Sequence, residues 1–117
     1  MNLVIHCGLH KTATTSFQHF CRSNQSELAS LGVCFPNYKG YNQHGLLMHE
    51  FQRLGIGVVE EYFGQFFEQA SPTSNTVLLS GESFENCIVD LSVAQELEEA
   101  AKKSGFSSGT WVVVTRN

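Results

Sequence analysis

The chain has 117 residues, of which 42% are hydrophobic and 15% are charged, and its formal net charge at neutral pH is −4. This length accommodates one compact domain over residues 1–117 and excludes a second full domain. The negative charge excludes a general attraction to nucleic acid or to anionic membranes, so an anionic ligand would need a local binding site.

Features that direct a chain to a membrane or to secretion are missing from the sequence. Met1 is not followed by a basic segment and a long apolar stretch, and no apolar run is long enough to span a bilayer. The four cysteines are widely spaced without a CxxC pair, a pattern as typical of buried thiols as of disulfides. We therefore expect a cytoplasmic protein with reduced cysteines.

The first two predicted elements are a strand and a helix. Residues 2–7 form a short apolar run that predicts a buried strand, and Gly8 ends it. Apolar side chains then recur at helical spacing over residues 14–31, and Gly32 stands where a helix C-cap glycine belongs. The chain therefore begins with a strand, a loop and a helix.

The middle of the chain predicts a loop and two helices. Residues 33–35 favour an extended segment that the next proline stops, and the polar residues 37–43 predict a flexible surface loop. Residues 44–54 and 58–70 have the spacing of amphipathic helices, with glycines between them. Their apolar faces predict that both helices cover a sheet.

Two further strands and a helix are predicted in the last third of the chain. Residues 76–79 and 111–114 are short apolar runs, and residues 91–104 have helical spacing with acidic residues early and basic residues late. Alternating strands and helices predict an α/β domain with a parallel sheet flanked by helices. Ligands of such sheets bind beyond the carboxyl ends of the strands. The segments in that position are residues 8–16, 80–85 and 116–117.

The segment 8–16 has the composition of an anion-binding loop. It reads Gly-Leu-His-Lys-Thr-Ala-Thr-Thr-Ser and joins the first predicted strand to the first helix. Free N–H groups at a helix start favour phosphate, the hydroxyls can add hydrogen bonds, and Lys11 adds a positive charge. The spacing is not that of the Walker A loop, GxxxxGK[ST]. A plainer alternative is that the hydroxyls cap the helix while Lys11 is solvated.

Residues 4–18 resemble the 5′-phosphosulfate-binding loop of bacterial-type sulfotransferases, which reads G-x-H-K-T-G-T-T-S; Ala13 stands where that loop has its second glycine. The resemblance implies a P-loop NTPase-like three-layer sandwich that uses 3′-phosphoadenosine-5′-phosphosulfate (PAPS) and no metal. It further implies that Lys11 binds the phosphosulfate and stabilises charge on the bridging oxygen during transfer. The cofactor-binding residues implied in this loop are His10, Lys11, Thr12, Ala13, Thr14, Thr15 and Ser16.

Residues 112–117, Val-Val-Val-Thr-Arg-Asn, resemble the second cofactor segment of the same family. The resemblance implies that Arg116 binds the 3′-phosphate, and a guanidinium fork suits that role. It also makes Glu82, after the strand 76–79, the first candidate for the catalytic base, and His44 the second. The plainer alternatives are that Glu82 or Ser83 caps a turn and that His44 merely begins a helix.

The implied function is transfer of a sulfuryl group from PAPS to a hydroxyl or amine of a small molecule, carbohydrate or lipid. Tyr38 and Tyr41, in the loop 37–43, are candidates for contact with that acceptor. The alternatives are a non-catalytic phosphate-binding, nucleotide-binding or interaction module and, with less support, a small-molecule kinase.

The resemblance covers only the amino-terminal part of a family domain. It therefore implies either a truncated domain or a minimal relative whose site needs another chain. In either case the last strand would leave apolar surface exposed, which favours a homodimer or poor solubility. A zinc site is rejected because His6 and Cys7 should point to opposite faces of a strand and no fourth ligand is apparent. We expect His6 to be a core residue instead.

Overall fold

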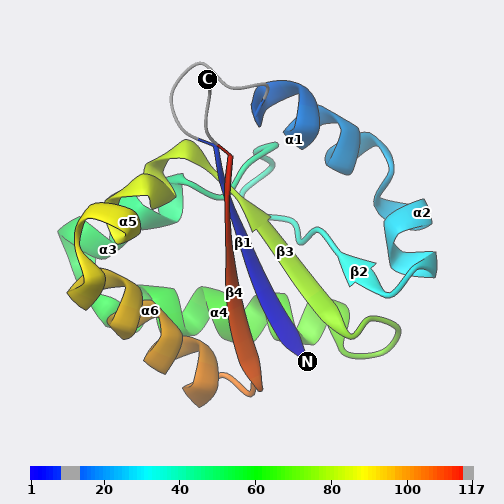
Figure 1. Ribbon diagram of the computed structural model, residues 1–117. Helices are drawn as coiled ribbons and strands as arrows, with labels where there is room; N and C mark the ends of the chain where they lie inside the picture. The colour runs from blue at the N-terminus through cyan, green and yellow to red at the C-terminus, as the bar shows by residue number, and fades with distance from the viewer. Residues whose placement is uncertain (9–13, 115–117) are drawn as a thin grey trace.

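The computed structural model describes residues 1–8 and 14–114, which form an α/β domain with a Cα radius of gyration of 13.2 Å (Figure 1). That radius is typical of a compact domain of this size. In chain order, the elements are β1 (Asn2–Gly8), α1 (Thr14–Ser23), α2 (Gln25–Ser30), β2 (Val33–Cys34), α3 (Leu46–Leu54), α4 (Ile56–Ala70), β3 (Thr76–Ser80), the 3₁₀ helix η1 (Glu82–Glu85), α5 (Asn86–Val89), α6 (Leu91–Lys103) and β4 (Ser108–Val114).

The four strands form one parallel sheet in the order β2-β3-β1-β4. This confirms the predicted parallel sheet, whose strands are connected through helices. Because β1 lies between β3 and β4, the carboxyl ends of these three strands meet at one edge of the sheet (Figure 1). The sheet therefore brings together the strand ends from which the predicted site segments start.

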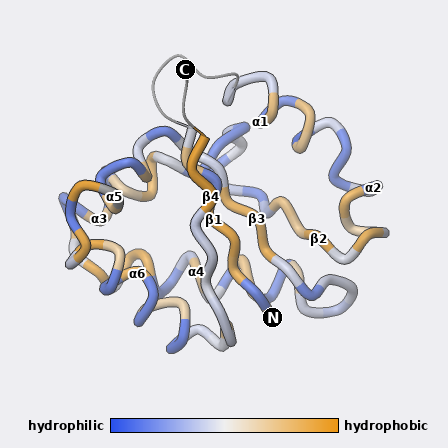
Figure 2. Tube along the Cα trace, in the orientation of Figure 1, coloured by the Kyte–Doolittle hydropathy of each residue, from blue (hydrophilic) through white to orange (hydrophobic). Residues whose placement is uncertain are grey.

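One face of the sheet supplies the main hydrophobic core. Leu3, Ile5 and Cys7 of β1 lie on this face with Val77 and Leu79 of β3, and all five are buried in one apolar cluster. The helices α3, α4 and α6 close the cluster, with α4 in contact with both β3 and α6. Figure 2 shows the hydrophobic stretches along the central strands and the end of β4. Strand periodicity explains the arrangement, because alternate side chains share a face.

The opposite face is covered near its carboxyl edge by α1. The Phe17 ring lies 4.4 Å from the His6 ring, centroid to centroid, and the Gln18 amide donates a hydrogen bond to Ser80 Oγ over 3.1 Å. By register, Val112 of β4 is the neighbour of His6 in β1, yet 42% of Val112 is exposed. Helix α1 therefore covers the β1 and β3 side of this face and leaves the β4 side open.

The predicted helix over residues 14–31 is wrong in one respect, because the structure breaks it into α1 and α2 at Asn24. The backbone of Asn24 leaves the helical region, with a φ of −121° and a ψ of 31°. Its side-chain amide donates to the carbonyl oxygen of Phe20 over 2.7 Å. Asparagine side chains compete in this way with the helix's own hydrogen bonds. Gly32 follows in the left-handed region, with a φ of 84°.

The segment 37–43, predicted as a flexible loop, contains a tight turn. Lys39 and Gly40 have φ values of 52° and 78°, and the N–H of Tyr41 donates to the carbonyl oxygen of Tyr38 over 2.9 Å. Two successive residues with positive φ are the mark of a type I′ turn. The Tyr38 side chain is buried, so the turn is anchored in the core.

Further along the chain, Gly55 separates α3 from α4, whereas Gly57 lies within α4. The elements η1 and α5, between β3 and α6, were not predicted. Among residues 1–8 and 14–114, no helix is long and apolar enough to cross a membrane.

Candidate functional site

The candidate site lies at the carboxyl edge of the sheet, where three strand ends meet. In the register of the sheet, His6 pairs with Ser80 of β3, and Gly8 pairs with Val114 of β4. Helix α1 begins at Thr14 above this edge. The edge is therefore the place at which a loop after β1, a loop after β3 and a residue after β4 can act on one ligand.

An open cleft of about 270 Å³ lies at this edge. Thr15 and Gln18 of α1 form one side, and Gln43 with Glu82 and Ser83 of η1 forms the other. The Thr15 and Glu82 side chains are exposed, whereas Gln18 is buried and bonded to Ser80. The lining combines hydroxyl, amide and carboxylate groups, which suits a polar ligand.

The predicted residues of the first loop fall partly inside the described region. Thr14, Thr15 and Ser16 form the first turn of α1, with Thr14 buried and the other two exposed. That turn contains no acidic residue, so the positive end of the helix dipole is not neutralised within it. His10, Lys11, Thr12 and Ala13 lie outside the described residues, and so does Arg116.

His44 is buried behind the cleft, where it joins three backbone segments. Its N–H donates to the carbonyl oxygen of Ser80 over 2.7 Å, and its ring Nδ1 accepts the N–H of Ser80 over 3.0 Å. With Nδ1 as an acceptor, the ring is neutral with its proton on Nε2, which lies 2.9 Å from the carbonyl oxygen of Pro36 and donates to it. Burial lowers the pKa of His44 to about 4.

This geometry assigns His44 a positioning role. Only 1% of the residue is exposed, and both ring nitrogens are bonded to backbone groups. No lone pair of the ring faces the cleft to receive a proton from a ligand. The exposed carboxylate of Glu82 is therefore the base candidate that the arrangement favours.

Ser80 is the centre of a second buried network on the α1 side of the sheet. Its hydroxyl lies 2.8 Å from Nδ1 of His6 and accepts from the Gln18 amide over 3.1 Å. Burial lowers the pKa of His6, which favours the neutral ring. His6 is thus a hydrogen-bonded core residue, as predicted, and the network ties α1 to both central strands.

Gly81 and Gly45 allow residues 43–45 and the start of η1, which together form one side of the cleft, to approach each other. A Cβ atom on Gly81 would lie 2.5 Å from the backbone nitrogen of Gly45, which is closer than real Cβ contacts permit. The close approach places Gln43 beside Glu82 and Ser83 in the cleft lining. Gln18, Gln43 and Ser83 were not predicted as site residues from the sequence. The signal that could have indicated this contact is Gly81, the glycine that directly follows the strand end at Ser80.

The thiol of Cys7 lies directly below the site and is a weak candidate for chemistry. Its Sγ donates to the carbonyl oxygen of Glu82 at 3.9 Å. Burial, followed by the carboxylates of Glu85 and Glu82, raises the pKa of Cys7 to about 11. The thiol is therefore protonated at neutral pH and serves as a core group. Within the described ranges, no three metal-ligating side chains are grouped in a way that could hold an ion.

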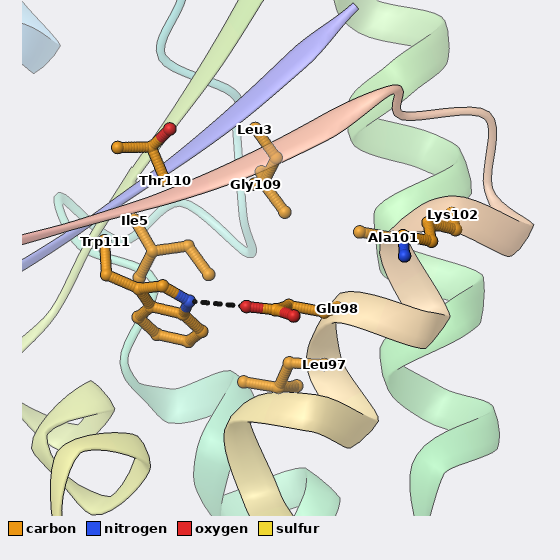
Figure 3. Close-up of a pocket in the computed structure, with 9 residues that line it drawn as sticks. All are labelled: Leu3, Ile5, Leu97, Glu98, Ala101, Lys102, Gly109, Thr110 and Trp111. Carbon is orange, nitrogen blue, oxygen red and sulfur yellow. Dashed lines mark hydrogen bonds between the residues drawn. The ribbon is translucent and has the colours of Figure 1, made fainter. Parts of the chain in front are cut away.

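A separate hollow lies between β4 and α6, away from the strand ends (Figure 3). Leu3, Ile5, Leu97 and Ala101 contribute apolar side chains, and the Trp111 indole donates to Glu98 Oε1 over 3.3 Å at one side. Although it is more enclosed than the cleft, its lining is mainly apolar. We therefore assign the polar chemistry to the strand-end cleft.

Comparisons with family models, with curated proteins and with solved structures each gave no match to this chain.

Proposed function

We propose that the chain binds PAPS at the carboxyl edge of its sheet and takes part in sulfuryl transfer to a hydroxyl or amine acceptor. The observation that carries the proposal is the convergence of the ends of β1, β3 and β4 on one polar cleft. The two segments that resemble sulfotransferase cofactor loops follow β1 and β4, which are neighbours in this sheet. The helices on both faces also suit the P-loop-like three-layer sandwich that the resemblance implies.

The described part of the cleft fits an anionic cofactor in two respects. The first turn of α1 presents Thr15 to the cleft and carries no acidic side chain. The positive end of a helix dipole and the N–H groups of a first helical turn favour phosphate groups. In this proposal, Lys11 and residues 14–16 hold the 5′-phosphosulfate, and Arg116 holds the 3′-phosphate.

When bound, PAPS supplies an activated sulfuryl group. The residues of the chain position the reactants and stabilise charge, as in phosphoryl transfer. Lys11 stabilises the negative charge that develops on the bridging oxygen, and a carboxylate oxygen of Glu82 accepts the proton of the acceptor hydroxyl. His44 and Gly81 contribute indirectly, because they hold the β3 end and η1 against residues 43–45.

Calorimetric titration with 3′-phosphoadenosine-5′-phosphate, the product form of the cofactor, tests this proposal. We expect the parent chain to bind and the Lys11→Ala and Arg116→Ala variants each to bind at least about tenfold more weakly, since a charge-assisted hydrogen bond contributes about 1.5–3 kcal/mol. Lys102→Ala, on α6, is the matched control and should bind like the parent. Absence of binding by the parent, or equal binding by all variants, would contradict the proposal.

A further inference from the structure

A third hollow, of about 290 Å³, lies beside the cleft, between the turn at residues 38–41 and helix α3. We call it the tyrosine groove. The residues of its lining on which the inference rests are Tyr38, Lys39, Tyr41, His49, Glu50 and Arg53. Neither the cofactor segments nor the proposed base lies within it, so the groove is a distinct feature of the surface.

A hydrogen bond joins the tyrosine groove to the cleft. Nε2 of His49, in the groove lining, lies 3.4 Å from Oγ of Ser83, in the cleft lining. Ser83 follows Glu82 directly in η1. A ligand with one hydroxyl at Glu82 can therefore extend past Ser83 and His49 into the groove.

The type I′ turn holds an aromatic surface rigidly at the groove. Tyr38 is 1% exposed and packs edge-to-face on Tyr62, with ring centroids 5.0 Å apart. Tyr41, directly across the turn, is 45% exposed. An exposed ring on an anchored turn loses little conformational entropy when a ligand packs on it. It offers an apolar face of the kind on which the C–H face of a sugar ring can lie.

Two of the charged side chains in the groove form an ion pair with each other, whereas a third forms none with the described residues. Lys39 forms an ion pair with Glu50, and its ammonium lies 5.8 Å and 5.7 Å from the ring centroids of Tyr38 and Tyr62. Arg53 has no ion-pair partner among residues 1–8 and 14–114. Its planar guanidinium is suited to paired hydrogen bonds with a carboxylate. In the groove, the charges of Lys39 and Glu50 therefore neutralise each other, and the guanidinium of Arg53 is available to an anionic ligand.

The Tyr38 hydroxyl is a buried polar group that the described residues leave unsatisfied. Burial and then the nearby Glu50 carboxylate raise the pKa of Tyr38 to about 12, so the hydroxyl keeps its proton and stays a donor. The hydroxyl is therefore a buried, protonated group beneath the groove, beside the Glu50 carboxylate.

From these features, we propose that the tyrosine groove binds the acceptor and that the acceptor is a sugar carrying a carboxylate. The Tyr41 ring packs on the sugar face, Arg53 binds the carboxylate, and His49 forms a hydrogen bond with a sugar oxygen. This inference rests on the proposed sulfuryl transfer, because it assigns an acceptor class to the same site.

The test uses methyl β-D-glucuronide and its neutral counterpart, methyl β-D-glucoside, in NMR titrations of the full chain. We expect the glucuronide to shift the amide signals of residues 38–41 and 49–53, and the glucoside to bind at least about tenfold more weakly. Tyr41→Ala and Arg53→Gln should each weaken glucuronide binding by a similar factor. Both side chains are exposed, so the variants should unfold at the same temperature as the parent.

Two control variants match these changes in chemistry and exposure. Phe20→Ala removes an aromatic side chain that is 58% exposed on α1, and Lys102→Gln removes a positive charge from α6. Both should bind the glucuronide like the parent. Equal binding of the two sugars would overturn the assignment of the carboxylate, and shifts outside the groove would overturn the assignment of the site.

A titration with 3′-phosphoadenosine-5′-phosphate on the same samples separates the two proposals. Nucleotide binding without any glucuronide binding up to about 20 mM, the weak end of useful affinities, would overturn the acceptor assignment and leave the cofactor proposal standing. Glucuronide binding without nucleotide binding would support the groove as an acidic-sugar site and overturn sulfuryl transfer.

Discussion

At the scale of single residues, the best-defined feature is His44, a neutral imidazole between the backbones of Pro36 and Ser80. From the sequence, the family resemblance and the neutral titration range of imidazole made this residue the second candidate for the catalytic base, with a plain histidine at a helix start as the alternative. The sequence could not reveal that both ring nitrogens bond to backbone groups from distant segments. The structure therefore gives His44 a role in fixing the end of β3.

The lowered pKa of His44 predicts that acid destabilises the fold. The ring titrates near pH 6.5 in the unfolded chain but near 4 in the folded chain, so the unfolded state binds more protons between these values. The free energy of unfolding should therefore fall by about 2 kcal/mol between pH 7 and pH 5. His6 acts in the same direction, because burial also lowers its pKa.

Urea unfolding at several pH values, combined with NMR titration of the histidine rings, checks this prediction. The His44 ring signal should stay that of a neutral imidazole at pH 5. A His44 ring that titrates near pH 6.5 in the folded chain would show that the prediction is wrong.

Replacement of Glu82 should affect nucleotide binding and sulfuryl transfer differently. Its carboxylate lies in the cleft where an anionic cofactor is proposed to bind, so Glu82→Gln removes a negative charge from that site. We expect the variant to bind 3′-phosphoadenosine-5′-phosphate as well as the parent or better, but to transfer sulfuryl groups about 10²–10⁴ times more slowly. Calorimetry and a transfer assay with the acceptor sugar measure the two effects. A variant with unchanged transfer would exclude Glu82 as the base.

At the scale of elements, the strands were the most predictable part of the chain. The runs at residues 2–7 and 76–79 consist mostly of apolar side chains, and such runs predict buried parallel strands. The break at Asn24 and the turn at residues 38–41 were missed because they depend on local hydrogen bonds and on positive φ values. Gln18 and Gln43 could not be predicted as cleft residues, because only the packing of distant elements brings them to the same cleft.

The close contact between Gly81, at the start of η1, and residues 43–45 predicts that one methyl group added at Gly81 lowers the folding stability. Gly81→Ala would place a Cβ atom 2.5 Å from the nitrogen and 2.6 Å from Cα of Gly45, and neither backbone atom can move freely. We expect a loss of about 3 kcal/mol of folding stability. The matched control is Gly64→Ala on α4, where a Cβ meets nothing within 4 Å. Alanine there should stabilise the helix by about 0.5–1 kcal/mol.

Thermal and urea unfolding of the two alanine variants measure this difference. Because both replace glycine with alanine, their comparison separates the steric clash from the change in backbone entropy. A Gly81→Ala variant as stable as Gly64→Ala would mean that residues 43–45 do not pack closely against the end of β3.

At the scale of the whole molecule, the apolar surface of β4 is the main departure from a well-covered domain. Val112, Val113 and Val114 are 42%, 42% and 39% exposed on an edge strand. Exposed apolar edge strands favour association with other chains. The expected homodimerisation or poor solubility stays a prediction. The exposed valines of β4 are the surface through which we expect the chains to associate.

Sedimentation velocity over a range of concentrations measures this association. We expect the parent chain to sediment faster as its concentration rises, and Val112→Thr with Val114→Thr to reduce that dependence. Val33→Thr, a matched change on the opposite edge strand β2, should leave the dependence as in the parent. A parent chain that stays monomeric at all concentrations would show that the exposed valines do not drive association.

The proposed binding of PAPS at the junction of three strand ends is tested most directly by mapping where 3′-phosphoadenosine-5′-phosphate binds. In an NMR titration, the amide signals of Gly8, Thr15, Ser83 and Val114 should shift, because these residues lie at the carboxyl edge of the sheet. Signals of Asn2, Thr76 and Ser108, which are aligned at the opposite edge, should stay in place. Shifts confined to that opposite edge, or the absence of any shift, would contradict the proposed function.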